Sequence, residues 1–215
     1  MEKDKIYTGN TLVKYSDENV QGETTLLNRQ QYYKISNYHQ MLPFFMSIVS
    51  NSDLWMFLSS NGALTAGRRN PDRALFPYYT DDRIHDSHDI TGNKTIVFVK
   101  KSDKTYLWEP FSSNYHGLYK IERNIYKNIL GNHIIFEEIN HDLNITFKYG
   151  WNNCDEYGFI KKSEVVNNNE GPVEINVCDG LQNILPSGID KKFQLEYSTL
   201  VDGYKKSELF PETNI

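Results

Sequence analysis

The sequence predicts an all-β protein made of antiparallel strands, with one short helix near its carboxyl end. The chain of 215 residues contains 15 Tyr, 11 Phe and 3 Trp but few alanines, and aromatic and β-branched residues suit a pleated surface better than a helix. Apolar and polar residues alternate over several segments. Turn signals recur at intervals of roughly 8–12 residues, which is typical of β-sandwiches and β-barrels.

The first strands are expected in two neighbouring segments. The segment "SIVSNSDLWMFLSSNGALTAG", residues 47–67, predicts three short strands that turn at Asn51-Ser52 and at Asn61-Gly62. The segment "TIVFVKKSDKTYLW", residues 95–108, predicts a hairpin that turns between Lys101 and Lys104.

A further hairpin is expected between His133 and Tyr149, where "HIIFEEI" and "NITFKYGW" flank the turn "NHD". In the second of these strands Ile145, Phe147 and Tyr149 share one face, which we expect to be the buried one. The segment "FIKKSEVVNNNEGPVEINVCDG", residues 159–180, predicts two more strands joined by the loop from Asn167 to Gly171.

One segment has the period of a helix. Apolar residues from Phe193 onward fall at i, i+4, i+7, i+8 and i+11, at Phe193, Tyr197, Leu200, Val201 and Tyr204. Gly203 and Pro211 favour an end to this helix, which we expect to lie on a sheet. Repeats and linkers of biased composition are lacking, so residues 1–215 are expected to form a single domain, the amino-terminal part of a longer protein.

Composition and charge exclude several classes of function. A net charge of −5 provides no basic surface for phosphate backbones, so nucleic acid is not an expected partner. The longest apolar run, "MLPFFMSIV", is shorter than the ~20 residues of a membrane helix, and "MEKDKIYTGN" lacks the apolar core of a signal peptide. We therefore expect a cytoplasmic protein, and we interpret Cys154 and Cys178 as buried free thiols.

The stretch "DDRIHDSHD", Asp81 to Asp89, concentrates carboxylates and histidines. In a strand, His85 and Asp89 would share one face while Asp86 and His88 share the other, so no face carries three metal ligands. We interpret the stretch as a solvated loop on the rim of the fold rather than a metal site. A loop that contacts a ligand is the alternative, and neither a metal nor another cofactor is expected.

The neighbouring "TAGRRNPDRALFPYY", residues 65–79, mixes guanidinium groups with aromatic rings. Sugars bind through this combination, because their C–H faces stack on rings while charged forks bind paired hydroxyls. The expected carbohydrate contacts are Arg68, Arg69, Asp72, Tyr78, Tyr79 and, at the end of a later strand, Trp108. The alternative is an edge loop whose arginines pair with Asp72, Asp81 and Asp82.

Other aromatic and acidic residues allow fewer conclusions. Trp55 and Trp151 are expected in the core, whereas Trp108 has equal claims to core and rim. Glu109 has no evident partner, and glycoside hydrolysis needs two carboxyl groups across one bond. The sequence contains no nucleophile elbow, phosphate loop or GxGxxG turn, so no catalytic residue is assigned.

The order of these segments resembles a known family. The segments "FFMSIVSNSDLWMFLSSNGALTAGRRNPD", "TIVFVK", "LWEPF", "YKIERN" and "GNHIIFEEINHDLNITFKYGW" follow one another as in the amino-terminal domain of cellobiose-phosphorylase-type enzymes, which are inverting glycoside phosphorylases. The ending "CDGLQNILPSGIDKKFQLEYSTLVDGYKKSEL" adds to the likeness, which spans roughly Tyr33 to Leu209.

The resemblance implies a galactose-mutarotase-like β-supersandwich that precedes a helical linker and an (α/α)6 barrel. In this family the catalytic acid and the phosphate-binding residues lie mainly in the barrel, so no catalytic residue is carried over to this chain. The sandwich supports the barrel, shapes one side of the sugar cleft and often contributes to a homodimer.

Three functions follow as hypotheses. The first is a non-catalytic sandwich domain of a glycoside-phosphorylase-like protein. The second is a stand-alone carbohydrate-binding module, which needs a row of exposed aromatic side chains on one sheet face. The third is a mutarotase-like epimerase, which needs a carboxylate within hydrogen-bond reach of two clustered histidines; the available histidines are His85, His88, His116, His133 and His141.

Overall fold

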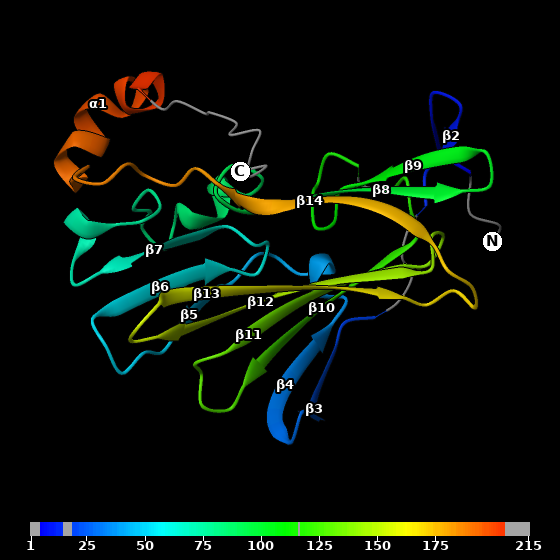
Figure 1. The fold of residues 1–215 in the computed structure, drawn as a ribbon, viewed down its shortest axis with the longest axis horizontal. Coiled ribbons are helices and arrows are strands. Elements are labelled where there is room, and N and C mark those ends of the chain that lie inside the picture. Colours follow the sequence, from blue (N-terminus) through cyan, green and yellow to red (C-terminus); the bar gives the residue numbers. More distant parts are fainter. Residues whose placement is uncertain (1–4, 15–18, 116, 205–215) are drawn as a thin grey trace.

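Antiparallel strands are the main secondary structure in a computed structural model that describes residues 5–14, 19–115 and 117–204 (Figure 1). The predicted all-β class is confirmed. The strands are β1 (Tyr7–Thr8), β2 (Thr11–Leu12), β3 (Gln21–Leu27), β4 (Gln30–Ser36), β5 (Phe45–Ile48), β6 (Leu54–Ser59), β7 (Leu64–Arg68), β8 (Gly92–Lys101), β9 (Lys104–Trp108), β10 (Ile121–Asn128), β11 (Ile134–Asn140), β12 (Ile145–Cys154), β13 (Gly158–Asn167) and β14 (Glu174–Gln182). Short 3-10 helices are η1 (Tyr38–Gln40), η2 (Pro71–Arg73) and η3 (Ile84–Ser87), and the α-helix is α1 (Lys191–Tyr204).

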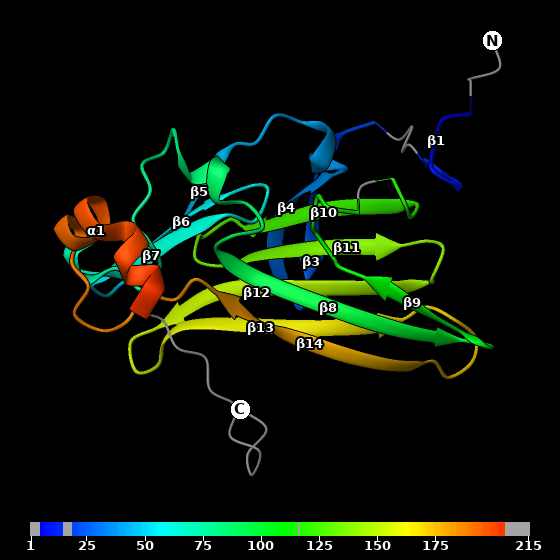
Figure 2. The ribbon, with the colours of Figure 1, turned by 90° about the horizontal axis from the view of Figure 1, so that it is seen from above.

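The strands form two layers that enclose one apolar core. One layer is a six-stranded sheet in the order β13-β12-β11-β10-β4-β3, and the three-stranded sheet β14-β8-β9 lies over it (Figures 1 and 2). The three-stranded sheet β5-β6-β7 lies at one end of the molecule (Figure 2). Side chains from all three sheets meet in a single buried cluster, to which Met56, Val97 and Phe136 each contribute. The architecture is therefore a β-sandwich.

The strands predicted from alternation are present. Ile145, Phe147 and Tyr149 are buried, as expected of the inner face of β12. Phe136 on β11 pairs with Tyr149 in register, and their rings stack with centroids 4.9 Å apart. The hairpins at β5-β6-β7, β8-β9 and β11-β12 all match their predicted turns.

Strands β13 and β14 follow one another in the sequence but belong to different layers. Strand β13 is the edge of the six-stranded sheet, whereas β14 crosses over and pairs with β8, where Val177 lies opposite Val97. The side chains of Lys161 on β13 and Asp179 on β14 form an ion pair of 2.7 Å that links the two layers.

A buried ion pair lies in the core between the layers. The Glu138 carboxylate is 1% exposed and accepts hydrogen bonds from Trp108 Nε1, from the Phe111 amide and from Arg123 Nε, each over 2.7 Å. A buried charge is tolerated when it is paired and hydrogen-bonded. These contacts tie the end of β9 to strands β10 and β11.

The predicted helix is present, but it does not lie on a sheet as expected. Its first turn contacts the η2 loop, because Asp72 Oδ1 accepts a hydrogen bond from the Lys191 amide and Gln194 Oε1 accepts one from the Tyr78 amide. Non-helical dihedral angles at Tyr197 interrupt the helix. The tail "ELFPETNI" lies outside the described residues. Among the helices that the structure describes, none has both the length and the apolar character to cross a membrane.

Candidate functional site

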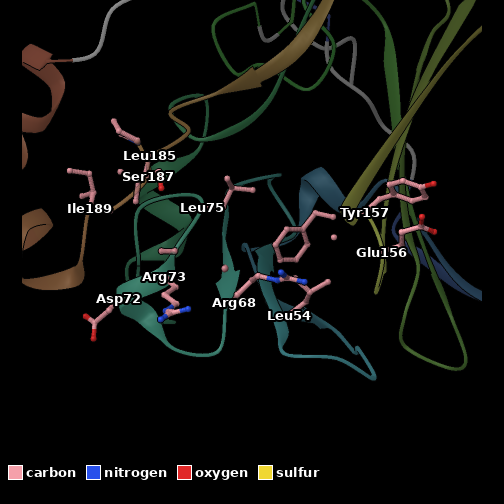
Figure 3. Close-up of a pocket in the computed structure, with 16 residues that line it drawn as sticks. Leu54, Arg68, Asp72, Arg73, Leu75, Glu156, Tyr157, Leu185, Ser187 and Ile189 are labelled. Carbon is pink, nitrogen blue, oxygen red and sulfur yellow. The ribbon is translucent and has the colours of Figure 1, made fainter.

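A pocket of about 810 Å³ opens at one end of the sandwich, and we call it the Arg68 pocket (Figure 3). Three parts of the chain surround it: the end of β7 with the η2 loop, the turn between β12 and β13, and the segment 185–189 that leads from β14 toward α1. Its lining side chains include Arg68, Asp72, Arg73, Glu156, Tyr157, Phe159 and Leu185. These residues are far apart in the sequence.

Gly67 allows the η2 loop to lie against β7. A Cβ atom at Gly67 would lie 2.5 Å from the Arg73 carbonyl oxygen and 2.6 Å from the Trp55 ring, so only glycine fits. The loop is held there by a bridge between Gly67 and Ala74 and by a hydrogen bond of 2.7 Å from the Leu75 amide to the Ala66 carbonyl. This close approach forms the wall that carries Arg73 and Asp72.

The two arginines predicted as sugar contacts share one carboxylate. Arg68 Nε lies 3.3 Å from Asp53 Oδ1, and Arg69 Nε lies 3.2 Å from Asp53 Oδ2. The alternative prediction named Asp72, Asp81 and Asp82 as partners. Among the described residues, neither Arg68 nor Arg69 forms an ion pair with any of these three. Arg68 lines the pocket while Arg69 does not, so the structure separates the two.

Asp72 lies on the wall opposite the turn that bears Tyr157. Its amide donates to Asn70 Oδ1 over 3.2 Å, and its own carboxylate accepts from the Lys191 amide over 3.3 Å. Asp72 therefore connects the pocket to the beginning of α1.

Tyr78 and Tyr79 do not line the Arg68 pocket. The Tyr78 ring meets the edge of Trp55 at 5.9 Å, and Lys191 Nζ lies 5.0 Å above its centre. The Tyr79 hydroxyl lies 3.5 Å from Thr91 Oγ1. These contacts of Tyr78 and Tyr79 hold the loop that follows η2 in place.

The prediction that Trp108 contacts sugar is wrong for this fold. Its side chain is only 2% exposed, and its indole N–H is bound to Glu138 in the core. Trp151 is buried as expected, whereas Trp55 is only partly buried on the outer face of β6. Glu109 does have a partner, since Lys94 Nζ lies 2.8 Å from its Oε1.

Sequence reasoning missed the part of the pocket contributed by the turn between β12 and β13. Figure 3 shows Glu156 and Tyr157 on the side of the pocket opposite Leu185, Ser187 and Ile189. Tyr157 is 74% exposed, which is unusual for a large ring on a short hairpin turn. The segment "CDEYG" contained a signal, because it places an aromatic residue directly in a tight turn.

The stretch "DDRIHDSHD", which the sequence predicted as a solvated rim loop, is solvated only in part, because Asp81, Asp82 and Asp86 are exposed while other residues of the stretch are buried. Ile84 and Ser87 in η3 are buried, and Asp89 accepts hydrogen bonds from the Ser113 amide and hydroxyl over 3.0 and 2.9 Å. Burial alone would raise the pKa of Asp89, but the Ser113 hydrogen bonds and the charges of His88 and Lys94 lower it below its usual value. Within the described ranges, no three His, Cys, Asp or Glu side chains are grouped as metal ligands.

A row of aromatic rings runs along the outer face of β5 and β6. Phe45 and Phe57 have centroids 5.4 Å apart, Phe57 and Trp55 are 5.8 Å apart, and Trp55 and Tyr78 are 5.9 Å apart. Phe45 is exposed, and the other three are partly buried. We call this set the aromatic row.

The described histidines are scattered over the fold. His85 Nδ1 contacts Ser59 Oγ at 2.7 Å, His133 Nδ1 contacts the Tyr32 hydroxyl at 2.6 Å, and His141 Nε2 lies 3.8 Å from Glu122. His88 lies 3.4 Å from Asp89, and His116 falls outside the described residues. No carboxylate of the described chain joins two of these histidines, so the geometry does not favour a mutarotase-like centre.

Models of known protein families and curated protein sequences give no match to this chain.

Proposed function

We propose that this chain is a non-catalytic carbohydrate-binding sandwich domain of a glycoside-phosphorylase-like protein, in which it shapes one side of a sugar cleft. The proposal rests on the Arg68 pocket, whose volume of about 810 Å³ lies within the range of small-molecule sites, roughly 300–1,000 Å³. The resemblance of the sequence to phosphorylase amino-terminal domains supports the same function.

The chemistry of the pocket suits a saccharide. Arg68 and Arg73 supply planar donor forks for neighbouring hydroxyls, while Asp72 and Glu156 supply acceptors. The ring of Tyr157 stands exposed at the edge, where the C–H face of a pyranose can stack on it.

Recognition fits this pocket better than catalysis. The side chains of Asp72 and Glu156 are both exposed, whereas a glycosidase acid needs burial to keep its carboxyl group protonated near neutral pH. The lining also contains no histidine or cysteine among the residues that the structure describes. We therefore assign reaction chemistry to the rest of the parent protein.

Helix α1 supports a junction with a further domain, which we propose is the (α/α)6 barrel. The helix follows the pocket segment 185–189 directly and carries exposed apolar side chains at Leu195 and Tyr197. Such side chains indicate a surface that another element covers. A homodimer contact and a cytoplasmic location remain parts of this proposal.

Titration with cellobiose, followed by NMR on the 15N-labelled chain, tests the binding. We expect shifts of the amide signals of Arg68, Arg73 and Tyr157, and we expect Arg68→Ala or Tyr157→Ala to weaken binding at least about tenfold. Arg83→Ala and Tyr7→Ala are matched controls, because both side chains are exposed and lie outside the pocket. Equal losses in control and pocket variants would contradict the assignment, as would an absence of shifts with cellobiose and with longer glucans.

The aromatic row favours a second candidate, a stand-alone carbohydrate-binding module. A row of rings on one sheet face can stack successive sugars of a linear chain. In the same titration this function predicts shifts of the Trp55 indole signal and loss of binding in Phe45→Ala, with the Arg68 signals unchanged.

A further inference from the structure

The outer face of the six-stranded sheet holds polar side chains that are buried nonetheless. Asn124, Glu137 and Lys148 lie side by side across β10, β11 and β12, on the face opposite to Phe136 and Tyr149. The free face of an antiparallel sheet is normally solvated, but Asn124 and Glu137 are buried. Here the face is hollowed into a second pocket of about 320 Å³, which we call the outer pocket.

A hydrogen-bond network holds the inner end of the outer pocket in place. Glu137 Oε2 accepts from Asn124 Nδ2 and from the Tyr126 hydroxyl, each over 2.8 Å, and Glu137 Oε1 lies 2.8 Å from Lys148 Nζ. Burial alone would raise the pKa of Glu137, but these hydrogen bonds lower it below its usual value. The charges of Glu137 and Lys148 thus compensate each other, and these contacts fix the positions of both side chains.

The histidine of the outer pocket contacts a tyrosine hydroxyl. The Tyr32 hydroxyl lies 2.6 Å from His133 Nδ1 and also 3.3 Å from Gln30 Oε1, so the tautomer of His133 decides which of the two groups donates in the shorter contact. Burial and the charge of Lys162 lower the pKa of His133. This shift favours the neutral ring, and the binding proposed below requires the tautomer with its proton on Nε2. A side chain at position 150 would lie 3.2 Å from Nε2, so Gly150 leaves space beside this nitrogen.

Two opposite charges stand at the rim without partners. Lys162 and Glu164 alternate with inward side chains on β13, so both point into the outer pocket. Both are exposed, and neither makes a hydrogen bond or an ion pair within the described ranges. Leu27 and Ile135 add apolar surface to the lining.

We propose that the outer pocket binds a small zwitterion, an α-amino acid. Its carboxylate is bound by Lys162 Nζ and His133 Nε2–H, its ammonium group by Glu164, and its side chain lies against Leu27 and Ile135. This arrangement satisfies both free charges at once, which a neutral sugar or a simple anion does not. The site shares no residue with the Arg68 pocket.

NMR titration of the 15N-labelled chain with single amino acids, from glycine to leucine and glutamine, tests the proposal. We expect shifts at His133, Ile135, Lys162 and Glu164, and we expect Lys162→Met and Glu164→Gln each to weaken binding at least about tenfold. Lys104→Met and Glu170→Gln are matched controls, because they make the same charge changes at exposed positions outside the pocket. Unchanged unfolding midpoints of the four variants establish that each is folded.

Acetate, methylamine and glucose are the competing probes. Weak or absent shifts with all three, beside clear shifts with an amino acid, support recognition of both charges. The proposal is overturned if acetate or glucose binds as tightly as any amino acid, if only one of the two rim variants loses binding, or if no amino acid shifts these signals. Ring 15N shifts that place the His133 proton on Nδ1 would also overturn it.

Discussion

The indole N–H of Trp108 donates a hydrogen bond of 2.7 Å to the buried carboxylate of Glu138. The residues are 30 positions apart, and their contact ties the end of β9 to the middle of the six-stranded sheet. Arg123 completes the charge balance from β10. Trp108, which the sequence predicted as a sugar contact, is therefore part of the core.

The first prediction concerns this buried pair. Glu138→Ala leaves the Arg123 guanidinium buried and unpaired, so we expect a loss of about 3–5 kcal/mol in the free energy of unfolding. Trp108→Phe removes one donor and leaves one carboxylate oxygen unsatisfied, for a loss of about 1–3 kcal/mol. Urea denaturation measures both, and Glu170→Ala, an exposed position, serves as the control. A change below about 1 kcal/mol for Glu138→Ala would contradict the network.

The second prediction tests the wall of the Arg68 pocket. Gly67→Ala places a Cβ atom 2.5 Å from the Arg73 carbonyl oxygen, so the η2 loop must move, and we expect a loss of about 1–3 kcal/mol. The same variant is expected to weaken cellobiose binding, because Arg73 and Asp72 move with the loop. Gly171→Ala is the matched control, since open space surrounds that position. Equal stability of the two variants would show that the loop does not need this close approach.

The third prediction concerns pH. Burial lowers the pKa of His88 and that of His133, so both rings resist protonation in the folded state. As the pH falls below the unfolded value, about 6.5, the unfolded chain binds protons that the folded chain does not. Stability is therefore complete above that pH and decreases toward the lower folded pKa values.

Denaturation at a series of pH values between 7.5 and 5 checks this dependence. His133→Gln is expected to flatten the decrease, whereas Gln31→Asn, at an exposed position that carries no titratable group, is expected to leave it unchanged. A stability that rises on acidification through this range would show that the described histidines are stabilised in their charged form.

The fourth prediction concerns the link between the layers. Lys161 and Asp179 are partly buried and 2.7 Å apart, whereas Lys100 and Glu174 form an exposed pair at 3.1 Å. In double-mutant cycles we expect about 1–3 kcal/mol of coupling for the first pair and about 0–0.5 kcal/mol for the second. Added salt is expected to remove the second coupling first. Similar couplings for both pairs would mean that Lys161 adds no specific link.

The sequence predicted the hairpins well because their information is local. Alternation identified the buried face of β12, and Asn61-Gly62 and the loop from Lys101 to Lys104 marked turns that the structure contains. The helix from Lys191 was found from its apolar spacing in the same way. The predictions were less accurate for residues whose neighbours come from distant segments of the chain, such as Trp108, Glu109 and Asp89.

The candidate site was predicted only in part for the same reason. Arg68 and Asp72 were identified from their own neighbourhood, and both line the pocket. Tyr157 and Glu156 were not predicted as members, because their turn meets the η2 loop only after β12 and β13 have paired. Tyr78 and Arg69 have suitable side chains, but neither lines the pocket: Tyr78 packs against Trp55, and Arg69 pairs with Asp53 outside it.

The sequence by itself determined the all-β class, the positions of most strands and turns, and the helix, because alternation, turn chemistry and helical spacing act between residues that are close in the chain. Tertiary structure alone decided that β14 leaves its neighbour to pair with β8, that Glu138 is buried beneath Trp108, and that two separate hollows form on the surface. Those outcomes depend on contacts between distant segments, where the burial of apolar area and the pairing of buried charges select one arrangement among many that satisfy the same local pattern.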